Sequence, residues 1–113
     1  MEFVLTFQQP ADIGLAYADP VQGPEISRAW GEYMGAMATA GVLRSGKQFD
    51  AGNASAVSVR EGRRVVRHAV APDAAHIPGG YVVIDVGTLE EALMWAERSP
   101  SSVRGCTEVW PGK

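Results

Sequence analysis

The stretch 79–96, GGYVVIDVGTLEEALMWA, contains a strand and a helix with almost no connection between them. Residues 81–86 are β-branched or aromatic except for Asp85, which predicts a strand covered on both faces. Thr88 and Glu91 have the spacing of a capping box, in which each side chain satisfies a free amide at a helix start. Leucine and alanine then recur at helical spacing and predict an apolar helix face directed at the sheet.

The remaining segments surround this unit within a single predicted domain, 1–113. We predict a strand at 2–7, a helix from Pro24 to Gly41, a hairpin of 54–60 and 63–70 turning at Glu61-Gly62, and a last strand at 106–110, joined by loops at 8–23, 42–53 and 71–78. This order predicts an α+β fold with two helices on one face of a mainly antiparallel sheet.

The face of this sheet away from the helices is predicted to carry valine and aromatic side chains. Exposed apolar surface costs about 25 cal/mol per Å². We therefore expect a homodimer in which two such faces cover one another.

Composition narrows the classes of function. A net charge of −3 argues against general nucleic-acid binding, because phosphate contacts need a basic surface. The single cysteine, Cys106, excludes an internal disulfide and suits a reducing compartment. No run is long and apolar enough to span a membrane. We expect a cytoplasmic protein that acts without nucleic acid or membrane.

The stretch 79–96, followed by Pro100, resembles the YCII-related proteins, in the branch named for its DGPF motif. The resemblance extends over nearly the whole chain through 40–46, 57–63 and 108–111. It implies a ferredoxin-like fold that forms a dimeric α/β barrel. The few activities it implies are cofactor-independent lyase or dehydrochlorinase steps.

The chain departs from that family at its defining motif. Counted back from the Gly-Gly pair, the DGPF tetrad falls on residues 68–71, HAVA, and none of its four residues is retained. The family's terminal arginine is replaced by Trp110. If the tetrad shapes a site in relatives, this chain has lost that site or rebuilt it around His68.

Three residues near the end of the hairpin are candidates for proton transfer. His68, Asp73 and His76 lie close enough in sequence to converge. Histidine exchanges a proton near neutral pH, and a carboxylate can orient it. We take His68 as the base and Asp73 or His76 as its partner. In the alternative reading, His68 is a packed strand residue and His76 is solvated. A metal site would need further ligands, so we expect neither metal nor cofactor.

Aromatic and sulfur-containing side chains of the first long helix are candidates for a ligand pocket. They are Trp30, Tyr33, Met34 and Met37. At helical spacing they are core residues first, although a Met-rich wall suits an adaptable pocket. Arg67 is the candidate anchor for an anionic substrate, because guanidinium offers a planar fork of donors.

Two other residues have structural interpretations. Asp85 is expected to be paired within the sheet, and Cys106 to be a small buried residue.

Two functions from different classes follow. The first is cofactor-independent acid–base catalysis, such as elimination, isomerisation or cyclisation, on a small hydrophobic or aromatic anionic metabolite. The second is a non-catalytic ligand-binding or accessory module that partners a larger enzyme or regulator.

Overall fold

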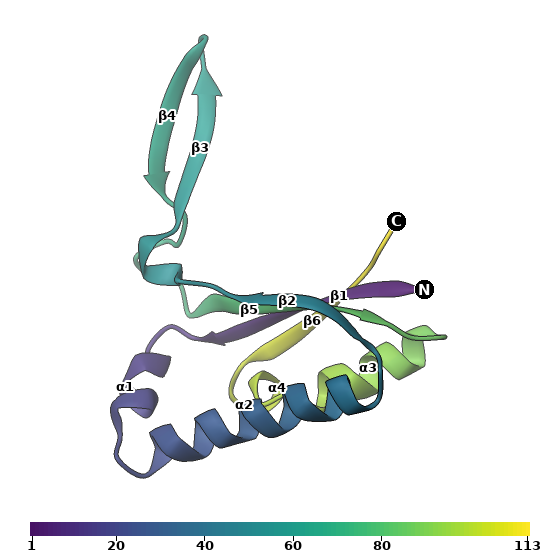
Figure 1. Cartoon of the computed structure of the whole chain (residues 1–113). Coiled ribbons are helices and arrows are strands. Elements are labelled where there is room, and N and C mark those ends of the chain that lie inside the picture. Colours follow the sequence, from purple (N-terminus) through teal and green to yellow (C-terminus); the bar gives the residue numbers. More distant parts are fainter.

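A four-stranded antiparallel sheet forms the central layer of the computed structural model, which describes residues 1–113 (Figure 1). Its strands are β1 (Glu2–Pro10), β2 (Leu43–Gln48), β5 (His76–Asp85) and β6 (Cys106–Pro111), in the order β2-β5-β1-β6. Each neighbouring pair is antiparallel. The predicted α+β class with a mainly antiparallel sheet is confirmed.

Two helices, α2 (Gln22–Thr39) and α3 (Leu89–Arg98), cover one face of this sheet (Figure 1). The shorter elements are α1 (Ile13–Ala18), the 3-10 turn η1 (Ala51–Asn53) and α4 (Ser101–Arg104). The order β1-α2-β2-β5-α3-β6, with β1 and β5 at the centre, is the ferredoxin-like arrangement.

Strand alternation builds the core between the sheet and the helices. Phe3, Leu5 and Phe7 of β1 are buried on the helix side, as are Val82 and Ile84 of β5. The helices contribute Tyr33, Met37, Ala92, Trp95 and Ala96 to the same cluster. Intervening strand residues belong to the opposite face, where Trp110 is 55% exposed.

The predicted cap of α3 is present. The Thr88 hydroxyl accepts a 3.1 Å hydrogen bond from the amide of Glu91. The Glu91 carboxylate accepts in turn from the amide of Gly87 at 3.2 Å, one residue before the expected donor. Both interactions fix the point at which β5 gives way to the helix.

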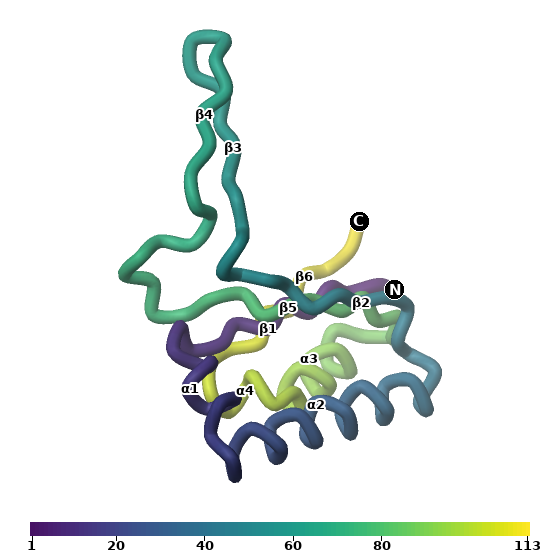
Figure 2. Tube along the Cα trace, turned by 60° about the vertical axis from the view of Figure 1, so that its left-hand side comes forward, coloured from purple at the N-terminus to yellow at the C-terminus, as the bar shows by residue number.

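The hairpin is a separate two-stranded sheet made of β3 (Ser55–Arg60) and β4 (Arg63–His68). Its turn residues Glu61 and Gly62 have φ of 52° and 75°, as a tight two-residue hairpin turn requires. Figures 1 and 2 show it rising from the main sheet on the side away from the helices. We call residues 55–68 the arm. The hairpin was predicted, but its separation from the main sheet was not.

All three predicted loops contain regular structure, and 71–78 is the least affected, because β5 begins at His76. The segment 8–23 continues β1 to Pro10 and then forms α1. The segment 42–53 holds β2, which pairs with β5 at the edge of the sheet. The sequence of β2, LRSGKQ, lacks an alternating apolar pattern because five of its six residues are exposed.

Candidate functional site

A cavity of about 430 Å³ lies between α2 and the sheet, near the end that carries α1. We call it the α2–sheet cavity. Its lining comes from β1 (Phe7, Gln9), α1 (Tyr17), α2 (Ser27, Trp30, Met34), β2 (Gly46, Lys47, Gln48) and β5 (Gly79, Gly80, Tyr81, Val82). A volume of this size suits a small molecule of one or two rings.

Aromatic rings form one wall of the α2–sheet cavity. The rings of Phe7 and Trp30 meet edge to face with centroids 4.9 Å apart, and Tyr33 packs behind Trp30 at 5.9 Å. Such contacts fix the orientation of the Trp30 indole. Met34 lies one helical turn further along α2 and adds a flexible apolar surface.

Glycines on the strand side of the cavity let the main chains of β2 and β5 approach closely. A Cβ at Gly80 would lie 2.6 Å from the Lys47 carbonyl oxygen, and one at Gly46 would lie 2.9 Å from the Tyr81 carbonyl oxygen. Gly79 is the extra residue of a bulge, because Phe7 pairs with Gly80 whereas the next residue of β1 pairs with Pro78. The main chain of β2 and β5 is thus bare at this part of the cavity.

Polar groups at the rim are neutral. Gln9, Gln48 and Ser27 line the cavity and offer both donors and acceptors. Neither a carboxylate nor an imidazole belongs to the lining. Lys47 pairs with Tyr81, and strand alternation assigns both side chains to the sheet face away from the helices, opposite to Val82.

Of the four helix residues predicted to bind ligand, Trp30 and Met34 line the cavity. Met37 is fully buried in the core. Tyr33 is also buried, and its hydroxyl donates a 2.8 Å hydrogen bond to the Trp95 carbonyl. Burial raises the pKa of Tyr33 well above its usual value, against a smaller lowering by Arg98.

His68 lies at the base of the arm, where backbone surrounds its ring. Nε2 is 2.9 Å from the Gly52 carbonyl oxygen and Nδ1 is 2.9 Å from that of Val70. Both hydrogen bonds raise the pKa of His68, because both carbonyls accept from the protonated ring, and the bond to Gly52 has the larger effect. In the neutral ring, Nδ1 instead accepts from the Val70 amide at 3.1 Å.

The other hairpin candidates are dispersed. Arg67 donates to the His68 carbonyl at 3.0 Å, and the two residues share a shallow open hollow at the arm base. Asp73 is exposed in the loop after the arm, and His76 is exposed at the start of β5, opposite Pro10. His68, Asp73 and His76 are not hydrogen-bonded to one another, and none of them lines the α2–sheet cavity.

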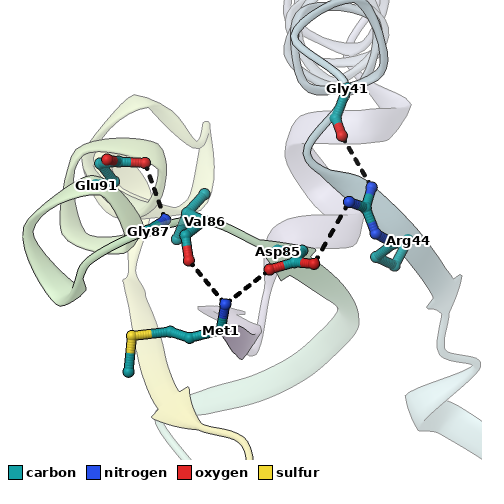
Figure 3. Close-up of polar contacts among 7 residues, drawn as sticks. All are labelled: Met1, Gly41, Arg44, Asp85, Val86, Gly87 and Glu91. Carbon is teal, nitrogen blue, oxygen red and sulfur yellow. Dashed lines mark hydrogen bonds and ion pairs between the residues drawn. The ribbon is translucent and has the colours of Figure 1, made fainter.

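Asp85 has the paired role expected for it, although its side chain is 38% exposed rather than buried (Figure 3). Its carboxylate lies 2.9 Å from the N-terminal ammonium of Met1 and 3.5 Å from the Arg44 guanidinium. The ammonium, followed by Arg44, lowers the pKa of Asp85. Arg44 also donates to the Gly41 carbonyl at 2.8 Å, which links the end of α2 to β5.

Two further properties bear on chemistry. Cys106 is exposed on β6, which corrects the expectation of a buried thiol, because residues 106, 108 and 110 all point away from the helices. No group of three or more His, Cys, Asp or Glu side chains is placed to hold a metal ion.

No helix has the length and hydropathy needed to cross a membrane.

No family model matches the sequence, and no curated protein matches it. The fold does match a solved structure, 5-chloro-2-hydroxyhydroquinone dehydrochlorinase (TftG) from Burkholderia phenoliruptrix AC1100 in complex with 2,5-dihydroxybenzoquinone. The TM-score is 0.56 over 100% of this chain and 94% of that chain, at 13% sequence identity. This likeness shows that the chain shares its fold, the ferredoxin-like arrangement described above, with that dehydrochlorinase.

Proposed function

We propose that the α2–sheet cavity binds a small aromatic molecule with oxygen substituents and that the chain carries out a cofactor-independent acid–base step on it. The observation that carries this proposal is the cavity itself, in which the Trp30 and Phe7 rings border the bare glycine backbone of β2 and β5. A flat ring can lie on this backbone beside the aromatic rings, and the Gln9 and Gln48 amides offer hydrogen bonds to oxygens at its edge.

The structural neighbour supports the choice of ligand class. Its name describes a dehydrochlorination of a hydroxylated ring, and its complex holds a dihydroxybenzoquinone. We propose that this chain belongs with the YCII-related proteins, acts on an aromatic compound of that kind and forms a homodimer through the open sheet face.

The proposed proton-transfer groups are His68, with Asp73 or His76. They lie at the arm base and the following loop, outside the lining of the cavity. To act as a base, His68 must also release a ring nitrogen from its backbone partner, Gly52 or Val70. Arg67, beside His68, is the proposed anchor for an anionic group.

A second function, binding without turnover, is favoured by a specific observation. The lining of the α2–sheet cavity contains neither a carboxylate nor an imidazole. General acid–base catalysis needs a titratable group within hydrogen-bonding reach of the reacting proton, most often one of these two. The titratable residues of the lining are Tyr17, Lys47 and Tyr81, and strand alternation directs the last two side chains to the other sheet face. A chain with these features would serve as a ligand-binding module for a partner enzyme or regulator.

The first test is binding of 2,5-dihydroxybenzoquinone, followed by quenching of tryptophan fluorescence. Trp30→Leu should weaken binding by about tenfold or more, since it removes one wall of the cavity. Trp110→Phe is the matched control, because Trp110 lies on the opposite sheet face, and it should bind as the wild type does. Equal affinity in the wild type and Trp30→Leu would overturn the cavity as the site.

The second test separates the two functions. The wild type is incubated with 5-chloro-2-hydroxyhydroquinone, and chloride release and ring absorbance are followed. Turnover that is lost in His68→Gln or His76→Gln supports acid–base catalysis by these residues. Turnover unchanged in both variants removes them from the mechanism. Tight binding of the quinone and of this phenol without any chloride release supports the binding module.

A further inference from the structure

The arm exposes more apolar surface than a solitary hairpin tolerates. Val57, Val59, Val65 and Val66 are 46 to 64% exposed. Val57 pairs with Val66, so these two and Val59 share one face of the hairpin. A two-stranded hairpin is marginally stable alone in water and needs a third strand or a packed surface. We therefore expect the apolar face of the arm to pack against another protein surface.

The charge of the arm indicates the charge of the surface that would pack against it. The arm holds four of the chain's ten Lys and Arg residues, namely Arg60, Arg63, Arg64 and Arg67, but one of its thirteen Asp and Glu residues, Glu61. The rest of the chain consequently carries six basic and twelve acidic side chains. A cationic arm and an anionic body are complementary between two copies of the same chain.

The position of the arm suits such a pairing. It rises on the sheet face opposite the helices, in both views (Figures 1 and 2). That face carries the half-exposed Trp110 and the carboxylate of Glu108. A second body that covers this face would lie alongside the arm, within reach of its valines and arginines.

We propose that the arm, residues 55–68, grips the body of a second copy of this chain. The inference rests on the proposed homodimer and adds the element that holds it together. By two-fold symmetry each copy gives an arm and receives one. Val57, Val59 and Val66 provide the apolar contact, and Arg64 shares their face of the hairpin. Arg60, Arg63 and Arg67 lie on its other face and add to the positive charge that attracts the acidic body of the other copy.

Hydrogen exchange of the unmodified protein tests this directly. Amides of β3 and β4 should become protected as concentration rises from about 1 µM to about 100 µM, in parallel with dimer formation in sedimentation equilibrium. Raising the salt from about 0.05 M to about 0.5 M should weaken the dimer, since exposed charges become screened.

Dimer dissociation constants of arm variants and matched control variants show which side chains make the contact. Val57→Ser combined with Val66→Ser should raise the dimer dissociation constant about tenfold or more, whereas Val103→Ser, at an 86% exposed residue of α4, should leave it unchanged. Arg63→Ser combined with Arg64→Ser should weaken the dimer and flatten its salt dependence. Arg28→Ser, on the exposed face of α2, is the control for charge.

Three outcomes would overturn the inference. They are a monomer at every concentration, a dimer whose arm amides stay unprotected, and arm variants that dimerise as tightly as the wild type. Arm protection that appears only on adding an acidic polymer such as duplex DNA would assign the arm to another partner. Quinone binding by each variant, through Trp30 fluorescence, is measured in parallel. It reports on the α2–sheet cavity, so a failure of the arm and a failure of the ligand proposal are distinguishable.

Discussion

The hydroxyl of Tyr33 donates a 2.8 Å hydrogen bond to the carbonyl oxygen of Trp95 and so ties α2 to α3 inside the core. The Trp95 carbonyl is available because α3 ends here. In a continuing helix the Ser99 amide would donate to it, but this amide donates to the Ala96 carbonyl instead, at 3.1 Å. The tyrosine predicted to line a ligand pocket thus completes the end of a helix.

Tyr33→Phe should lower the free energy of unfolding by about 1–2 kcal/mol, because it leaves the Trp95 carbonyl buried without this partner. Tyr17→Phe is the control for stability, since the Tyr17 side chain makes no hydrogen bond within the chain and is 38% exposed. Urea unfolding measures the free energy of unfolding of both variants and of the wild type. A Tyr33→Phe variant as stable as the wild type would show that the hydrogen bond contributes nothing net.

The same residue predicts a loss of stability at high pH. The folded-state pKa of Tyr33 is raised, so the unfolded chain releases this proton first. The contribution is complete below about pH 10 and declines as pH rises further, by up to about 1.4 kcal/mol per pH unit. Tyr33→Phe removes this component, so the wild type should lose stability more steeply than the variant above pH 10. Parallel pH profiles would contradict the prediction.

His68 should titrate above the ordinary histidine value of about 6.5 in NMR experiments, because two carbonyls accept from its protonated ring. A raised folded-state pKa gives stability that is fully present below the unfolded value and lost as pH rises through the folded one. The stability gap between wild type and His68→Gln should therefore be largest in acid and narrow above neutral pH. A His68 pKa at or below the ordinary value would refute this.

Asp85 gives the opposite pH dependence. Its pKa is lowered by the N-terminal ammonium and by Arg44, so its contribution is present above the unfolded pKa and lost as pH falls through the folded one. Asp85→Asn should unfold at lower urea than the wild type at neutral pH, and the two midpoints should converge below about pH 4. Asp12→Asn is the control, since that side chain forms no cap on α1.

Glycines in α2 and in β2 should respond oppositely to alanine. A Cβ at Gly31 or Gly35 meets nothing within 4 Å, so alanine there should stabilise the protein by about 0.5–1 kcal/mol each through helix propensity. Gly46→Ala should destabilise it and reduce quinone affinity, because the new methyl meets the Tyr81 carbonyl oxygen. Thermal unfolding and fluorescence titration measure these effects. Stabilisation by Gly46→Ala would show that β2 moves freely away from β5.

The parts of the fold that were predictable depend on patterns of residues close together in the sequence. The Thr88–Glu91 box, the helical stripe of α3 and the Glu61-Gly62 turn each follow from residues close in sequence. β2 was missed because its side chains are exposed and show no alternation. The isolation of the arm was missed because an alternating pattern predicts a strand and not the sheet that the strand joins.

The candidate site was predictable to the extent that it lies on a helix. Trp30 and Met34 were found through their spacing, but Phe7, Gly46 and Gln48 were not. Their place in the cavity depends on the pairing of β2 with β5 and on the bulge at Gly79, which are long-range features. Proximity in sequence also did not bring His68, Asp73 and His76 into mutual contact, because β4 ends in a different sheet from the one that β5 enters.

The detachment of the arm from the rest of the fold has an evolutionary consequence. Mutations along residues 55–66 leave the core and the cavity untouched, since both are built from other segments. They also spare Arg67 and His68, which have proposed roles toward the substrate. In the proposed dimer, lengthening, shortening or recharging this part of the hairpin would alter which chains assemble while ligand choice stays constant. Descendants of one ancestral gene copy could thereby stop mixing with each other long before their substrates diverged.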